Sequence, residues 1–77
     1  MHKHRNLEPG EQVGLHLAEG AELFCAHGLL RVTVATPWMA DAAQARLLAA
    51  GQGWRAGQPT RITVQAEEAS RYIVGQR

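Results

Sequence analysis

The sequence predicts an all-β fold, a small antiparallel sandwich or barrel. Apolar and polar residues alternate with a period of two through most of the chain, which is the pattern of half-buried strands. Turn residues, chiefly glycine, separate the alternating segments, and the last two segments are rich in β-branched and aromatic residues. Five short strands at this spacing are typical of a sandwich or barrel. A chain of 77 residues forms one domain, whose core is close to the smallest that is stable by itself.

The first half of the chain contains three of these segments, QVGLHLA, AELFCA and GLLRVTVATPW. Turns are predicted between them at Glu19-Gly20 and His27-Gly28, because glycine tolerates the positive φ that tight turns need. The alternation predicts a shared apolar face, made of Val13, Leu15, Leu17, Ala21, Leu23, Cys25, Leu30, Val32 and Val34. Phe24 lies on the opposite face of its segment.

The second half ends in two further strands, TRITVQA and SRYIV, with Ile62 and Val64 on one face of the first. The alanine-rich segment 41–50 before them is ambiguous. Asp41 can cap a short helix that Gly51 would end. The same residues also fit a loop followed by a strand, because a helix of two turns is weak without tertiary packing. Local pattern leaves both structures open.

Composition limits the class of protein. Eight Lys and Arg against seven Asp and Glu give a net charge near +1, too small to attract nucleic acid or anionic lipid over the whole surface. One cysteine excludes an internal disulfide and fits a reducing compartment. Residues 1–6 are basic but no apolar run follows them, so we expect a flexible N-terminus ahead of a single domain over 7–75, no signal peptide or membrane span, and a cytoplasmic protein.

A family resemblance adds to this interpretation. Taken in order, LEPGEQVGLHL, GAELFCAHGLLRVT, a tryptophan, an aspartate, LLAAGQGWRAG, RITVQA and RYIV resemble the small bacterial domain of unknown function 2917. The resemblance covers Leu7 to Val74 and implies a short cupin-like barrel of six or seven strands. It also implies a loop over Asp41 to Ala45 and a strand over Arg46 to Ala49. Trp38 lies later than the tryptophan of many relatives, so it is either a core residue or exposed.

Candidate chemistry is sparse. Cupin-type metal sites use two histidines one residue apart with a glutamate and a later histidine, whereas His2 and His4 lie in the expected flexible N-terminus. Three further side chains are weak candidates for zinc or copper ligands, namely His16, Cys25 and His27. Cys25 is expected to be a small buried hydrophobe, and no nucleophile has a base in reach except His27. We therefore predict no metal, no cofactor and no enzymatic activity.

Nucleic-acid binding is the main alternative class. Five arginines take the polar phase of their strands, namely Arg31, Arg46, Arg55, Arg61 and Arg71. Gathered on one sheet face beside a tryptophan, they would resemble a groove for single strands. GQGWRAG lacks the lysine and helix of a phosphate cradle, so its glycines are expected to form turns.

The sequence therefore predicts a non-enzymatic binding, accessory or regulatory module with a degenerate, metal-free cupin pocket. A small apolar or aromatic molecule is the expected ligand, and two copies are expected to pair as a homodimer. The predicted pocket lining consists of Trp38, Trp54, Phe24, Tyr72 and His16. A metal-binding cupin-like protein is the second alternative.

Overall fold

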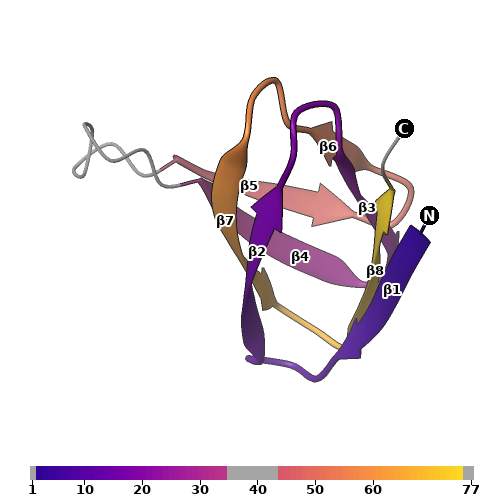
Figure 1. The fold of residues 1–77 in the computed structure, drawn as a ribbon. Coiled ribbons are helices and arrows are strands. Elements are labelled where there is room, and N and C mark those ends of the chain that lie inside the picture. Colours follow the sequence, from indigo (N-terminus) through magenta and orange to yellow (C-terminus); the bar gives the residue numbers. More distant parts are fainter. Residues whose placement is uncertain (1, 35–43, 76–77) are drawn as a thin grey trace.

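The computed structural model describes residues 2–34 and 44–75, which form eight strands and no helix (Figure 1). The strands are β1 (His2–Leu7), β2 (Gln12–Leu17), β3 (Glu22–His27), β4 (Leu29–Val34), β5 (Gln44–Ala49), β6 (Gly53–Arg55), β7 (Thr60–Ala66) and β8 (Ser70–Gly75). Sheet A has the order β1-β8-β3-β6 and sheet B the order β2-β7-β4-β5. The all-β prediction is confirmed, with eight strands in place of six or seven.

The strand pairing is nested, because β1 pairs with β8, β2 with β7, β3 with β6 and β4 with β5, all antiparallel. This is the result of rolling up one long hairpin that has β4 and β5 at its tip. Successive pairs then fall alternately in sheet A and sheet B, as in jelly-roll sandwiches. Two more ladders, β3 with β8 and β4 with β7, join the pairs within each sheet.

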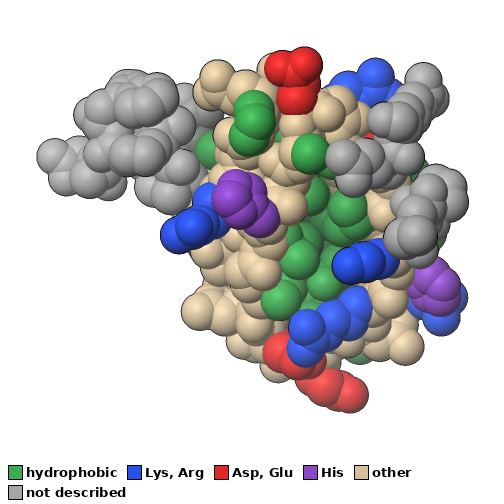
Figure 2. Space-filling model, in the orientation of Figure 1, with side chains coloured by type: hydrophobic (Ala, Val, Ile, Leu, Met, Phe, Trp, Pro, Cys, Tyr) green, Lys and Arg blue, Asp and Glu red, His purple; other side chains and the backbone are tan. Residues whose placement is uncertain are grey.

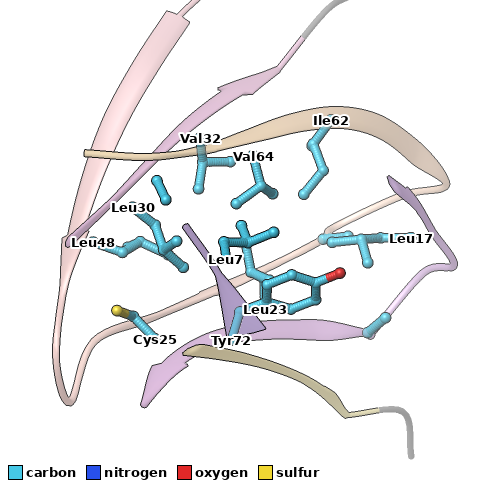
Figure 3. Close-up of a cluster of buried hydrophobic side chains, with 13 residues drawn as sticks. Leu7, Leu17, Leu23, Cys25, Leu30, Val32, Leu48, Ile62, Val64 and Tyr72 are labelled. Atoms are coloured by element: carbon cyan, nitrogen blue, oxygen red, sulfur yellow. The ribbon is translucent and has the colours of Figure 1, made fainter. Parts of the chain in front are cut away.

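The core fills the space between the two sheets, where side chains from both point toward one another (Figure 3). Leu23, Leu30 and Val64 are fully buried, and the remaining core residues are at most 4% exposed. The cluster comprises Leu7, Leu17, Ala21, Leu23, Cys25, Leu30, Val32, Leu48, Ala56, Ile62, Val64, Ala66 and Tyr72. The predicted apolar faces are confirmed, although Val13, Leu15 and Val34 are only partly buried.

One sequence-based expectation differs from the structure at the level of elements, and one open alternative is decided by it. We predicted a flexible N-terminus over 1–6, whereas residues 2–6 lie in β1, which pairs with β8 along its whole length. Of the ambiguous segment, residues 44–49 form β5, so strand and not helix is correct there. Pairing with β4 supplies the tertiary contacts that decide against the helix. Asp41 and Trp38 lie outside the described residues. The described part of the chain contains no helix that could cross a membrane.

The turn between β3 and β4 is tied to the turn between β7 and β8. Gly28 has a φ of +87°, and the Oγ atom of Ser70 lies where a side chain on Gly28 would begin. That hydroxyl accepts a hydrogen bond from the Leu29 N–H at 3.0 Å and lies 2.7 Å from the Glu68 carbonyl oxygen, to which it donates. The predicted His27-Gly28 turn is thus present, with His27 as the last residue of β3.

Candidate functional site

The inner sides of the two sheets, where the predicted pocket would lie, carry the buried side chains of the core. Tyr72 is part of that core and is 4% exposed. Trp54 pairs with Leu23 on the inner side of sheet A and packs partly buried against the core. Phe24 points the other way, to the outside of sheet A, and His16 is exposed on sheet B. The predicted lining residues are therefore not brought together, and Trp38 lies outside the described residues.

The outer face of sheet A carries a shallow concavity of about 390 Å³. Its middle is a row of three cross-strand neighbours, in which Ile73 of β8 lies between His4 of β1 and Phe24 of β3. Glu22 and Gly75 complete the lining. Gly75 has no side chain and leaves the space beside Ile73 open, so the two apolar side chains form a floor with a carboxylate and an imidazole beside it.

A second concavity of about 400 Å³ adjoins the first along the same strands. Asn6 and Arg71 each stand two residues from the central row, and they pair with one another across β1 and β8. The Arg71 Nε donates to the Asn6 Oδ1 at 3.2 Å. His27 of β3 lies beside Arg71, and Glu8 is on the rim. This half of the face is polar, whereas the Phe24 half is apolar.

A bulge places His27 on this face. The register of β3 against β8 shifts between Cys25 and His27, so Cys25 is opposite the buried Tyr72 while His27 is opposite the exposed Arg71. Without the shift, the two residues would share one face. Cys25 and His27 therefore diverge, and His16 lies on the other sheet. No cluster of three metal-ligating side chains occurs among residues 2–34 and 44–75.

Cys25 is a buried free thiol with no exposed surface. Burial raises the pKa of the Cys25 thiol, a backbone hydrogen bond from His27 lowers it by less, and the nearby Glu68 carboxylate raises it again. A thiol in this state is a poor nucleophile. Cys25 thus packs as a small hydrophobe, as the sequence predicted.

The five arginines do not share a face. Arg31 and Arg61 lie on the outer face of sheet B, and Arg55 and Arg71 on the outer face of sheet A. Arg46 pairs with the buried Val32, so it belongs to the inner side of β5, and it is exposed. The Arg31 Nε is 2.8 Å from the Glu67 Oε1, which neutralises one of them. The continuous arginine groove expected for single-stranded nucleic acid is not formed.

Sequence reasoning missed Ile73 and His4. A signal for Ile73 was present, because Ile73 alternates with Tyr72 and must face outward once Tyr72 is assigned to the core. His4 had no such signal, since Leu7 is the single buried residue among residues 3–7 of β1. A scan against protein-family models finds no match to this chain, and a search of curated proteins finds no relative either.

Proposed function

We propose that this protein is a non-enzymatic binding module that takes a small aromatic or apolar ligand on the outer face of sheet A. The observation that carries the proposal is the row formed by Phe24, Ile73 and His4, which lines a concavity of about 390 Å³. This volume is within the range of small-molecule sites. The proposal also regards the rolled hairpin as a cupin-type barrel whose interior has become solid core.

The chemistry of the rim selects among ligands. Phe24 and Ile73 offer an apolar surface on which a flat ring can stack. Glu22 stands at one side, and its carboxylate leans over Gly53, because a Cβ on Gly53 would lie 3.2 Å from the Glu22 Oε2. A ring that carries a hydrogen-bond donor or a positive charge fits this position better than one that carries a carboxylate.

The test is a titration of the ¹⁵N-labelled chain with benzylamine, indole and benzoate, followed by amide chemical shifts. We expect shifts on β3 and β8 around Phe24 and Ile73, with benzylamine binding more tightly than benzoate. Phe24→Ala should abolish the shifts. Leu47→Ala is the matched control, because Leu47 is 52% exposed on the outer face of sheet B. The proposal fails when both variants bind alike or when the shifts gather elsewhere.

We include a homodimer in the proposal. β5 is one of the two edge strands of sheet B in the described part of the chain, and it presents the exposed large hydrophobic Leu47 beside Arg31 of β4. An unpaired edge with an exposed apolar side chain favours pairing with a second copy. The free thiol of Cys25 is compatible with a reducing, cytoplasmic setting.

A further inference from the structure

The edge between β1 and β2 is a separate surface. Among the eight described strands, β1 ends sheet A and pairs only with β8, while β2 ends sheet B and pairs only with β7. Within the described residues no ladder joins β1 to β2, although a short turn connects them in the chain. Each strand therefore presents a row of backbone N–H and C=O groups with which none of the other described strands pairs.

An apolar strip is exposed between these two edges. Figure 2 shows hydrophobic side chains along the gap between β2 and β1. Val13 and Leu15 of β2 and Val74 of β8 belong to the inner side of their sheets and are only partly buried there, packed against the core. Closing this gap would bury apolar surface that the chain leaves in contact with water.

Two cations stand beside the strip. Lys3 and Arg5 occupy the inner side of β1, because they pair with Val74 and the buried Tyr72, and both are exposed. Arg5 shares its charge with Glu11, 3.2 Å away. β1 has no acidic residue, and His2 and His4 complete its basic sequence HKHRNL. Two such edges would repel one another, so a second copy is a poor partner here.

The unpaired backbone also argues against a lipid chain. An acyl chain lying in the gap would cover the edge N–H and C=O groups without replacing their hydrogen bonds to water, which costs about 1–3 kcal/mol for each group left unpaired. An extended peptide supplies matching groups of its own. A β-strand is therefore the occupant that can both cover the apolar strip and form hydrogen bonds with the unpaired backbone groups of the edges.

We propose that the free edge of β1 binds an extended acidic segment of a partner protein, which adds a strand to sheet A. The inward side chains of the added strand are apolar where they pack on Val13, Leu15 and Val74. One of its side chains is a carboxylate that lies beside Lys3 and Arg5. The backbone ladder supplies affinity, and the two cations select against basic or self-complementary strands.

The probes are two heptapeptides of alternating threonine and valine, one with a central glutamate and one with a central lysine. Titrated into the ¹⁵N-labelled full chain, the glutamate peptide should shift the amides of β1 and slow their hydrogen exchange. We expect the glutamate peptide to bind about tenfold more tightly than the lysine peptide. The reason is that Lys3 and Arg5 attract the glutamate side chain and repel the lysine side chain.

Charge reversal completes the test. Lys3→Glu should remove or invert the preference between the two peptides, whereas Arg61→Glu on the outer face of sheet B should leave it unchanged. Equal binding of both peptides, binding by neither, or protection confined to β5 overturns the proposal. A purified chain whose β1 amides are already protected in a dimer also overturns it, because a second copy then holds the edge.

Discussion

Gly28→Ala tests the tie between the two turns that fix β3 and β8, the central strands of the candidate ligand face. Two costs combine at this position. A φ of +87° costs an L-residue about 1 kcal/mol. The new Cβ would also meet the Ser70 Oγ, the Ala69 carbonyl oxygen and the Ser70 Cα, the last at 2.8 Å. Backbone atoms cannot swing aside as the end of a flexible side chain can, so the turns must separate.

The separation breaks the hydrogen bond that the Leu29 N–H donates to the Ser70 Oγ at 3.0 Å, and it weakens the contact of that hydroxyl with the Leu29 carbonyl oxygen at 3.1 Å. The loss of these contacts adds about 1–2 kcal/mol, which brings Gly28→Ala to about 2–3 kcal/mol in all. A domain of this length has a free energy of unfolding of roughly 4–12 kcal/mol, so the loss is measurable by urea unfolding followed by circular dichroism.

Gly20→Ala is the matched control. Gly20 has a φ of +84°, and a Cβ there would have no atom within 4 Å. Gly20→Ala should therefore lose only the free energy of holding an L-residue at positive φ, about 1 kcal/mol. Ser70→Ala isolates the hydrogen bonds and should cost about 1–2 kcal/mol. Equal losses for the two glycine variants, to within about 0.5 kcal/mol, would refute the reasoning.

Three other predictions concern single side chains. Cys25 should react slowly with a thiol reagent at pH 8 in the native chain and rapidly in denaturant, because burial raises its pKa and hides its sulfur; fast native labelling would contradict this. Glu67→Gln should lower the free energy of unfolding by less than about 1 kcal/mol in low salt and by nothing measurable in 1 M salt, since the ion pair of Glu67 with Arg31 is exposed. A larger loss that does not depend on salt would be inconsistent with an exposed ion pair. Leu47→Glu should convert the proposed dimer to monomer in light scattering, and an unchanged mass would exclude the β5 edge as its interface.

Alternation predicted which residues face the core but not which sheet each strand joins. The period of two placed Leu23, Leu30 and Val64 inward, and all three are fully buried. Consecutive strands β3 and β4 nevertheless belong to different sheets, because the hairpin rolls up through contacts between residues far apart in the chain. For this reason Arg31 and Arg55, both on the polar phase, are on opposite sides of the molecule.

The sequence analysis did not predict strand β1, for a related reason. An edge strand at an open gap does not need an apolar inner side, so Lys3 and Arg5 stand where alternation would require hydrophobic residues. The orientation of His27 was equally inaccessible, since it depends on a bulge that only the pairing with β8 reveals. Both the candidate ligand face and the β1 edge thus arise from cross-strand neighbours rather than from local sequence.

The size of the chain explains why these surfaces and not the barrel interior are the candidates. An interior pocket of about 300 Å³, the lower end for a small-molecule site, would replace packed side chains by empty volume. At about 24 cal/mol per Å³, such a cavity costs about 7 kcal/mol. That is comparable to the whole free energy of unfolding expected for 77 residues, roughly 4–12 kcal/mol. A jelly roll this small therefore needs its interior for Leu23, Val64 and the rest of the core, which favours the outer faces and the edges of the sheets as places for a partner.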